Sequence, residues 1–263
     1  MGITNRVRIE SANENEAMKL ASISKRAFDS DIDVGLHEPG GPPGYDTPKA
    51  QVWFMKIMDY YTIFLDENIV GGLIISSKGR EHRVLERIFV DPQYHRKGIG
   101  TRVFELLSER YPKVRLWTLG TPEWNVRTKH FYEKLGFVQI GWELGPPNER
   151  GRWYQRVMDP SEPYKMITIA ELKDGMKDVT VEGEIQKISA SKKVKSRSTG
   201  KPLTVANADL RDDTETTKLV LWDEQISQVK VGDKVRIEFG YVSSYRGINQ
   251  LNVGRIGRLI ILI

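Results

Sequence analysis

Residues 89–104 constrain the fold more than any other part of this chain. They read Phe-Val-Asp-Pro-Gln-Tyr-His-Arg-Lys-Gly-Ile-Gly-Thr-Arg-Val-Phe, which predicts the end of a strand, a glycine-containing turn and the start of a helix. The apolar run Val84–Val90 before the turn and the amphipathic pattern Val103–Leu107 after it support this interpretation. The pattern is typical of a mixed α/β domain.

The turn itself predicts a binding site for an anion. The first turn of a helix carries N–H groups without intrahelical acceptors and the positive end of the helix dipole. Gly98 and Gly100 allow a bulky phosphate to approach the backbone, and Arg96 and Lys97 add positive charge. A cofactor with a diphosphate group fits these features, whereas a glycine turn alone also occurs as a helix cap.

The segment His95-Arg96-Lys97-Gly98-Ile99-Gly100 resembles the pyrophosphate loop of the GCN5-related N-acetyltransferases (GNAT), whose pattern is Gln/Arg-x-x-Gly-x-Gly/Ala. His95 departs from that pattern. A second block, 125–137, resembles the later family motif Asn…Phe-Tyr-x-x-x-Gly-Phe. The resemblance implies a GNAT fold, with a mixed central sheet and flanking helices, and acetyl-CoA as cosubstrate. The cofactor-binding residues that it implies are Ile88, Phe89, Val90, His95, Arg96, Lys97, Gly98, Ile99, Gly100, Thr101, Asn125 and Tyr132.

The same resemblance implies two catalytic residues. Tyr132 is expected to protonate the departing thiolate, although a tyrosine that only packs on the cofactor would give the same pattern. Glu86 is the favoured base, because strand alternation places it on one face with Ile88 and Val90. The alternative is a solvent-facing Glu86 paired with Arg83 or Arg87. Since the chain has no cysteine, direct attack by the acceptor is expected rather than an acyl-cysteine route.

The loop at 31–51 is expected to shape the acceptor site, as the corresponding loop does in the family. Its carboxylates would favour a cationic amine, though an ordinary surface loop is an equally good interpretation. Trp53 and Phe54 are expected in the core. The carboxylates are Asp31, Asp33, Glu38 and Asp46.

Composition narrows the class of protein. The apolar fraction is 39% and no apolar run reaches the roughly 18 residues that span a bilayer, so we expect no membrane partner. The N-terminus lacks a signal-peptide pattern, which favours a cytoplasmic protein. The absence of cysteine excludes disulfides and thiolate metal sites, and four scattered histidines favour no metal.

The chain is predicted to divide into two domains, at 1–158 and 166–263, joined by a proline-containing linker at 159–165. Strand-like and helix-like patterns alternate in the first domain. Expected strands are 6–10, 60–66, 69–76, 82–90, 113–119, 137–143 and 153–158, and expected helices are 14–28, 101–111 and 124–135.

The second domain has mostly strand-like patterns, with a short helix at 223–229. Five strands with one intervening helix in about 100 residues suggest a small closed barrel. The apolar tail 259–263 is expected to close the barrel as a strand rather than to enter a partner. The five expected strands are 179–189, 203–210, 217–221, 234–242 and 248–251.

Residues 164–263 are similar to the single-OB-fold single-stranded DNA-binding proteins of archaea, on the segments 169–176, 218–222, 231–237 and 247–252. The resemblance implies an all-β OB-fold, a five-stranded barrel. In those proteins aromatic residues on one barrel face stack on bases. The matching residues are Trp222, Tyr241 and Tyr245, of which two are Tyr where Trp and Phe are usual. Trp222 could instead belong to the barrel core.

A basic loop between the first two expected strands would follow a phosphate backbone, although a solvated loop has the same composition. No acidic residue occurs from 185 to 208. Segment 164–263 holds 17 Lys and Arg against 13 Asp and Glu, so it carries +4 of the net charge of +5. The basic residues expected to contact nucleic acid are Lys192, Lys193, Lys195, Arg197 and Arg246.

The sequence therefore predicts an acetyl-CoA-dependent N-acetyltransferase that acts on an amine of a protein or small molecule and carries a domain for single-stranded DNA or RNA. That domain would bring the enzyme to its substrate. The first alternative is a non-catalytic CoA sensor that binds nucleic acid. The second is a small-molecule acetyltransferase whose barrel binds protein.

Overall fold

The computed structural model describes residues 3–76, 79–144, 150–161, 164–196, 200–254 and 257–263. The chain separates into two compact units, Met1–Val138 with Tyr154–Glu162, and Gln139–Trp153 with Pro163–Ile263. The segment Gln139–Trp153 thus clusters with the C-terminal part of the chain. Among the described residues, no helix is long and apolar enough to cross a membrane.

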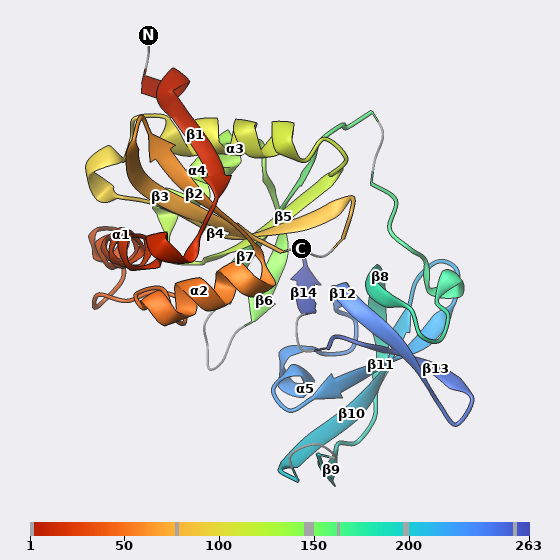
Figure 1. Cartoon of the computed structure of the whole chain (residues 1–263). Coiled ribbons are helices and arrows are strands. Elements are labelled where there is room, and N and C mark those ends of the chain that lie inside the picture. The colour runs from red at the N-terminus through yellow and green to blue at the C-terminus, as the bar shows by residue number, and fades with distance from the viewer. Residues whose placement is uncertain (1–2, 77–78, 145–149, 162–163, 197–199, 255–256) are drawn as a thin grey trace. The chain divides into compact units, whose positions relative to one another are not determined.

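The first unit is a strongly twisted sheet with helices on both faces (Figure 1). The strands follow the order β1-β2-β3-β4-β5-β7, antiparallel from β1 to β4, and β4 pairs in parallel with β5. Strand bounds are β1 Val7–Ser11, β2 Asp59–Leu65, β3 Asn68–Ile75, β4 His82–Val90, β5 Leu116–Pro122 and β7 Arg150–Val157, of which the part from Tyr154 on belongs to this unit. Strand β6, Val138–Leu144, belongs to the second unit from Gln139 on. Helix bounds are α1 Ala17–Asp29, α2 Pro48–Ile57, α3 Ile99–Arg110 and α4 Val126–Lys134, with short 3-10 turns at Ile3–Arg6, Glu14–Glu16, η3 Ser30–Val34 and Pro92–Tyr94.

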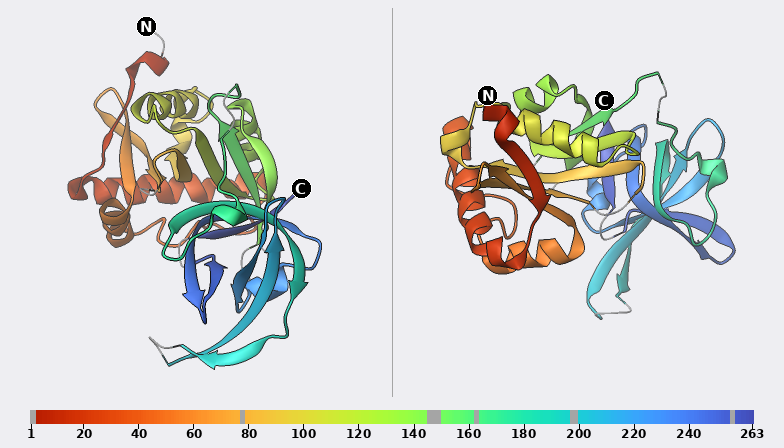
Figure 2. Two further views of the ribbon diagram at one scale, coloured as in Figure 1. Left: turned by 90° about the vertical axis from the view of Figure 1, so that its right-hand side faces the viewer. Right: turned by 45° about the horizontal axis from the view of Figure 1, so that its top comes forward.

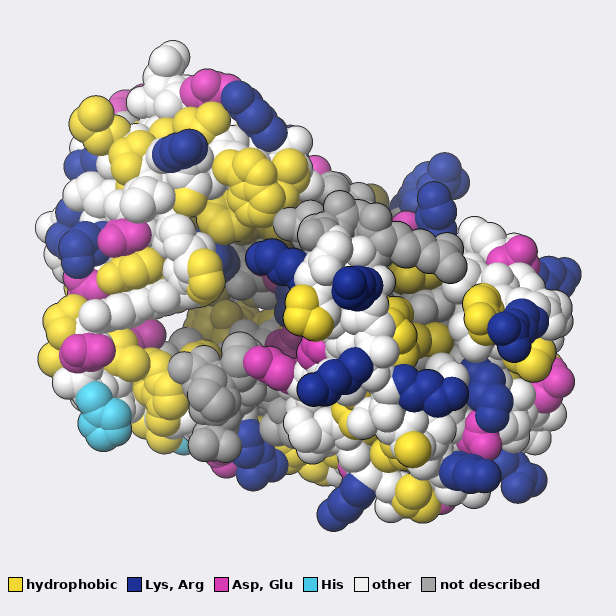
Figure 3. All heavy atoms as spheres, turned by 90° about the horizontal axis from the view of Figure 1, so that it is seen from below, with side chains coloured by type: hydrophobic (Ala, Val, Ile, Leu, Met, Phe, Trp, Pro, Cys, Tyr) yellow, Lys and Arg dark blue, Asp and Glu magenta, His cyan; other side chains and the backbone are white. Residues whose placement is uncertain are grey.

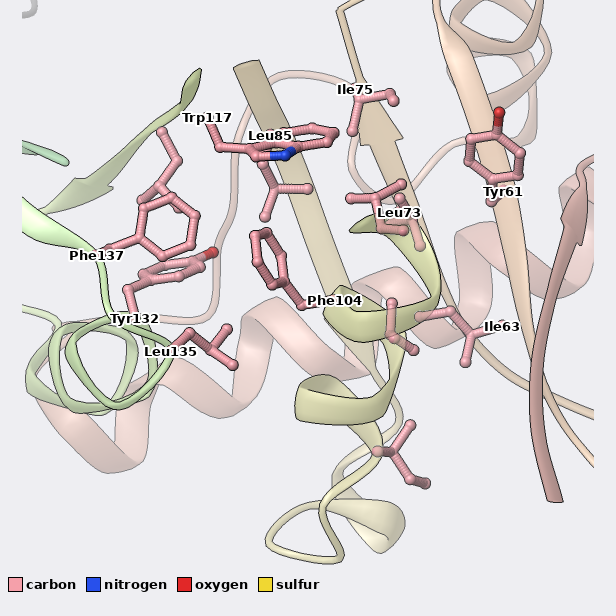
Figure 4. Packing of buried hydrophobic residues seen from close by; sticks show 14 of the residues in the cluster. Tyr61, Ile63, Leu73, Ile75, Leu85, Phe104, Trp117, Tyr132, Leu135 and Phe137 are labelled. Atoms are coloured by element: carbon pink, nitrogen blue, oxygen red, sulfur yellow. The ribbon is translucent and has the colours of Figure 1, made fainter. Parts of the chain in front are cut away.

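Two apolar clusters lie on opposite faces of this sheet. One joins α3 and α4 to the strands, and the other joins α1 and α2 to them. Figure 4 shows the first cluster, in which Phe104 of α3 lies beside Leu85 and Trp117. Burial of these large side chains, several of them fully inaccessible, supplies most of the driving force for folding of the unit.

Most expected elements of the first unit are confirmed within a few residues, and His82–Val90 matches at both ends. Helix α2 was missed, because residues 31–51 were interpreted as one long loop. Thr47 precedes Pro48 at the first helical position, which is the local signal for its start. Phe54 is in the core as expected, but Trp53 is 53% exposed, because adjacent helical residues face different sides.

The second unit is formed mainly by strands that curl around a single apolar core (Figure 2). The pairings form a circuit β8–β10–β11–β13–β12–β8, while β9 adds to β10. The bounds are β8 Lys177–Ile188, β9 Lys192–Lys195, β10 Pro202–Arg211, β11 Thr216–Trp222, α5 Gln225–Gln228, β12 Lys234–Tyr245, β13 Ile248–Asn252 and β14 Arg258–Leu262, with a 3-10 turn at Ile169–Glu171.

Two expectations for this unit are wrong. The basic segment at 192–195 is a strand rather than a loop, because it pairs antiparallel with the start of β10 as β9. The apolar tail forms β14, but the circuit is closed by β8 and β12. The tail pairs instead with the first half of β12 and, within the same unit, with residues 141–143 of β6.

A cluster of hydrogen-bonded polar side chains lies on the outer side of β12. Val235 and Ile237 point into the core, so Arg236 and Glu238 point outward, yet both are buried. Arg236 Nε donates to Glu182 Oε1 at 2.8 Å, and Trp153 Nε1 donates to Glu238 Oε1 at 3.1 Å. Glu238 is fully inaccessible, and Trp153 Nε1 and Arg236 Nη1, the latter at 3.5 Å, donate to its Oε1 atom in place of water.

We expect Trp153→Phe to destabilise the second unit by about 1.5–3 kcal/mol, because a buried carboxylate loses a hydrogen-bond donor. Urea unfolding would measure the loss. Trp53→Phe is the matched control, since the exposed Trp53 ring packs only at the surface against Phe54. Equal midpoints for the two variants would contradict the role given to the indole N–H.

Candidate cofactor and nucleic-acid sites

The turn before α3 has the geometry that an anion site needs. Arg96 (φ 60°) and Gly98 (φ 78°) both adopt left-handed backbone conformations, and Gly98 is the residue that caps the helix. The first intrahelical bond runs from Arg102 N to Gly98 O at 3.1 Å. The N–H groups of residues 99–101 therefore have no acceptor within the helix. Alternating left-handed residues and a free helix start orient backbone N–H groups toward one point.

The charge around this turn is positive. Arg96 and Lys97 are exposed, and the first turn of α3 contains no acidic residue. The Lys97 Nζ atom lies 5.1 Å from the centre of the Tyr94 ring, so the ammonium stays beside the turn. The turn can hold a diphosphate by backbone donors and by two cations.

Gly100 has a structural reason as well as the expected functional one. A Cβ atom at this position would lie 2.9 Å from two atoms of the Phe131 ring, which is closer than side chains pack. The missing side chain lets α3 approach α4. The Ile99 side chain is buried in the core, so this residue can contribute only its backbone to the turn.

His95, the departure from the family pattern, turns away from the phosphate site. Its Nε2 atom lies 2.7 Å from the Val90 carbonyl oxygen, which can only accept, so Nε2 carries the proton. Burial lowers the pKa of His95, opposed by that hydrogen bond. A neutral His95 donates a hydrogen bond to the end of β4 and adds no positive charge to the phosphate site.

Strand β4 contains an irregularity beside the expected base. The pairing with β3 shifts between Ile74, which pairs with Arg87, and Ile75, which pairs with Leu85, so Glu86 is the extra residue. Leu85, Ile88 and Val90 consequently pack on one face. The alternation on which the expected face of Glu86 depends is interrupted at this residue, so the expectation that Glu86 shares a face with Ile88 and Val90 stays a prediction.

Phe89, which lies between Ile88 and Val90 on β4, packs on the opposite face, toward α1 and α2. Glu86 is only partly exposed and takes part in other interactions of the structure. Its role as the base stays a prediction.

Tyr132 is buried within the aromatic part of the first cluster. Its ring centre lies 5.1 Å from Phe131, 5.8 Å from Phe137 and 6.3 Å from Tyr154, and Figure 4 shows the ring between Phe137 and Leu135. Burial and, to a smaller extent, the charge of Asp31 raise the pKa of Tyr132. The phenol is therefore protonated at neutral pH, as a proton donor must be.

Asn125 and Arg127 hold the start of α4 to η3. Asn125 is buried, and its Oδ1 atom accepts from Thr128 N at 3.1 Å, which caps the helix. The Arg127 guanidinium forms an ion pair with Asp31 and donates to Ser30 Oγ at 3.2 Å. Asp33, Glu38 and Asp46 are exposed, so Asp31 is the buried carboxylate of the expected acceptor loop.

The sequence interpretation did not identify Arg127. The available signal was a cation in the first turn of a predicted helix, where the dipole disfavours positive charge. A nearby carboxylate can offset this unfavourable interaction with the helix dipole, as Asp31 does for Arg127.

Strand register places the expected base-stacking residues of the second unit on one outer face. The core residues Leu219, Leu221, Val242 and Leu251 alternate with side chains that point outward. Across neighbouring strands, one outward row is Lys192–Val205–Trp222, the next is Asn207–Val220–Asn252–Tyr241, the third is Asp209–Lys218–Gln250–Ser243, and the last contains Ile248 and Tyr245.

The three aromatic side chains of this face are accessible. Trp222, Tyr241 and Tyr245 are 37%, 40% and 54% exposed, so Trp222 is not a core residue. Gly254 lies against the Tyr241 ring, where an added Cβ would be 3.2 Å from two ring atoms. The Arg246 guanidinium carbon lies 5.3 Å from the Tyr245 ring centre. The face thus offers ring surfaces at both ends of a polar centre.

Positive charge accompanies this face. Lys192, Lys193 and Lys195 are exposed on β9, and Figure 3 shows many Lys and Arg side chains on the displayed surface of the second unit. Lys218, in contrast, forms an ion pair with Asp209 in the middle of the face. Arg197 lies outside the described residues.

Comparison with known proteins finds one protein family model that matches the N-terminal part of the chain and another that matches the C-terminal part. Residues 33–137 match the acetyltransferase (GNAT) family model, and residues 179–259 match a model described as an OB-fold nucleic acid binding domain. Residues 33–137 are thus similar to the GNAT family, and residues 179–259 are similar to OB-fold nucleic acid binding domains.

Three individual proteins illustrate the likeness. The uncharacterized protein YrkN of Bacillus subtilis (strain 168) is 34% identical over 79 residues, which cover 29% of this chain and 43% of YrkN. The single-stranded DNA binding protein Ssb of Saccharolobus solfataricus is 28% identical over 86 residues, 33% of this chain and 57% of Ssb. A crystal structure of an acetyltransferase from Thermus thermophilus is 17% identical, covering 60% of this chain and 100% of that one, with a TM-score of 0.48.

The chain spans about half the length of each of the two curated relatives. Each match therefore concerns a part of the relative and not the relative as a whole protein.

The lowered pKa of His95 predicts a pH effect on stability. Because the unfolded chain binds a proton near the ordinary value of 6.5 and the folded chain resists it, stability is present above that pH and is lost as the pH falls through it. We expect the unfolding free energy of wild type to fall between about pH 7.5 and 5.5 more than that of His95→Gln. Parallel pH profiles of the two proteins in urea unfolding would contradict this account.

Proposed function

We propose that the chain is an acetyl-CoA-dependent N-acetyltransferase whose OB-fold domain binds single-stranded nucleic acid. One observation carries the first part. The turn at 95–101 combines two left-handed residues, a helix start without carboxylates and two exposed cations, within a segment that matches the GNAT family model. The description of that model as an acetyltransferase family supports acetyl transfer as the class of reaction.

In this proposal the backbone N–H groups of residues 98–101 bind the diphosphate, assisted by Arg96 and Lys97. The backbone of residues 88–90 orients the pantetheine arm, next to the irregularity in β4. His95 keeps Val90 in place through their hydrogen bond. Acetyl-CoA supplies a reactive acetyl thioester, and the protein supplies position and proton transfer.

Tyr132 holds the proton that the sulfur needs when its bond to the acetyl carbon breaks. The acceptor nitrogen forms the new bond to that carbon and gives up one proton, which Glu86 or a water chain removes. The overall exchange is then balanced, with one proton leaving the nitrogen and one reaching the sulfur. Since the chain lacks cysteine, no acyl-cysteine step is needed.

Tyr132→Phe is expected to lower kcat by about 100-fold or more while leaving the affinity for CoA nearly unchanged, because only the proton donor is lost. Thiol release from acetyl-CoA, measured with a panel of primary amines, follows kcat. Tyr154→Phe is the matched control, since it removes a hydroxyl from the same cluster, where Tyr154 contacts Glu133 rather than the expected thiol.

An unchanged rate in Tyr132→Phe would contradict the acid role. Tight CoA binding without turnover in the wild-type protein would instead support the alternative, a CoA sensor.

For the second unit, we propose that bases stack on Trp222, Tyr241 and Tyr245 while the β9 lysines contact phosphates. The supporting observation is the shared outer face of these residues and their exposure. Aromatic stacking tolerates any base, so the expected ligand is single-stranded DNA or RNA without strong sequence preference. Bound nucleic acid would hold the enzyme near acceptors on the same molecule or complex.

We expect Trp222→Ala to weaken binding of a labelled oligothymidylate by about 1–3 kcal/mol, since one stacking surface is lost. Lys193→Ala should instead reduce the dependence of affinity on salt concentration. Fluorescence anisotropy at several salt concentrations measures both effects. Trp53→Ala, at an exposed tryptophan of α2, serves as the control, and equal affinities for it and Trp222→Ala would contradict stacking at Trp222.

A further inference from the structure

The ion pair between Asp31 and Arg127 calls for an explanation beyond the joining of two segments. Asp31 lies in η3, between α1 and α2, and only 13% of its side chain is exposed. Arg127 lies in the first turn of α4 and is 32% exposed. Its guanidinium contacts η3 at Asp31 and at Ser30, so a carboxylate and a guanidinium face each other at the edge of the first unit's core.

Holding η3 to α4 with this ion pair costs free energy in two ways. A buried carboxylate loses hydration, and a cation at a helix start opposes the dipole. Burial raises the pKa of Asp31, even though Arg127 and the Asn125 side chain act in the opposite direction. Replacing such a pair with packed apolar residues is often neutral or stabilising, so its presence points to another use of the two charges.

The pair is joined to the proposed chemistry through α4, because Arg127 and Tyr132 lie on this same helix. Among the described residues, Asp31 is the charged group that acts on the pKa of Tyr132, the expected proton donor. Asp31 also acts on His95, which holds Val90 at the end of β4. Asn125, at the start of α4, acts directly on Asp31. The ion pair therefore stands at the start of the helix that carries the expected proton donor, and its carboxylate acts electrostatically on that residue.

We propose that Asp31 and Arg127 together bind an acceptor of the free α-amino acid type, with its ammonium group on Asp31 and its carboxylate on Arg127. This proposal rests on the N-acetyltransferase function proposed above and names the acceptor class for that site. A zwitterion can enter the ion pair and leave both protein charges compensated.

Other acceptors would lack this compensation. A simple amine that took Asp31 would leave Arg127 without its acid, and a simple carboxylate would leave Asp31 without its cation. A charge left unpaired at a half-buried position carries the full cost of its lost hydration. The ion pair thus selects for adjacent opposite charges rather than for positive charge alone. A lysine side chain within a protein does not offer them.

The direct test is binding of small acceptors to the full chain saturated with CoA, measured by saturation-transfer NMR. Alanine, leucine and glutamate would be compared with their α-carboxamides, which keep the ammonium but lose the α-carboxylate, and with propionate, which lacks the ammonium. We expect at least one free amino acid to bind about ten-fold or more tightly than its amide and than propionate. Equal affinity of acids and amides would overturn the proposal.

Variants test the two residues separately from the fold. Asp31→Asn and Arg127→Gln should each lose about ten-fold or more in amino-acid affinity, while CoA affinity stays as in wild type. Weaker CoA binding in Arg127→Gln would overturn the proposal by assigning the guanidinium to the cofactor. Loss of CoA binding by the wild-type chain would instead refute the proposed acetyltransferase function itself.

The double variant with exchanged charges, Asp31→Arg with Arg127→Asp, keeps an ion pair between η3 and α4. We expect its thermal stability to approach that of wild type, whereas acetylation of the amino acid stays lost because the ammonium would bind at the wrong end of the site. Recovery of both stability and acetylation would show that the pair is only structural. If this variant fails to fold, the binding series with Asp31→Asn and Arg127→Gln decides the question.

Discussion

The candidate cofactor site depends on one constraint, the turn before α3, because the start of this helix leaves backbone N–H groups without acceptors. The turn at 95–98 must reverse the chain after β4, and it does so with left-handed conformations at Arg96 and Gly98. Helix α3 is then fixed by burial of Ile99 and by contact between Gly100 and Phe131. The core therefore sets the direction in which these N–H groups point, and packing prepares the anion site before any ligand arrives.

Local patterns predicted the succession of strands and helices along the first unit and the turn before α3, because both depend on short-range chemistry. Alternating apolar residues and the Gly-x-Gly segment identify β4 and α3 wherever the chain folds. The face of Glu86 was not predictable in this way, since the irregularity beside it arises from pairing with β3, a separate strand. The contact of Arg127 with Asp31 joins residues 96 positions apart and was missed for the same reason.

The second unit shows how one alternation serves both folding and binding. On β11, Leu219 and Leu221 fill the core while Trp222 points outward, and Val242 and Tyr241 divide in the same way on β12. The sequence predicted these aromatic residues by resemblance and left open whether Trp222 belongs to the core. The structure answers that question, because a strand has only two faces and Trp222 alternates with the core residue Leu221. The sequence pattern did not predict β9, whose lysines have the composition of a loop and form a strand only because β10 is available to pair with them.

The central claim is that the turn before α3 binds the diphosphate of CoA, and calorimetric titration of the full chain with CoA tests it most directly. We predict micromolar binding that weakens when Gly98 is replaced by alanine, because its φ of 78° is unfavourable for any residue with a Cβ. Gly40→Ala, at a glycine with only a distant neighbour and no left-handed conformation, should bind like wild type. No heat of binding in wild type, or equal binding by Gly98→Ala, would contradict the account.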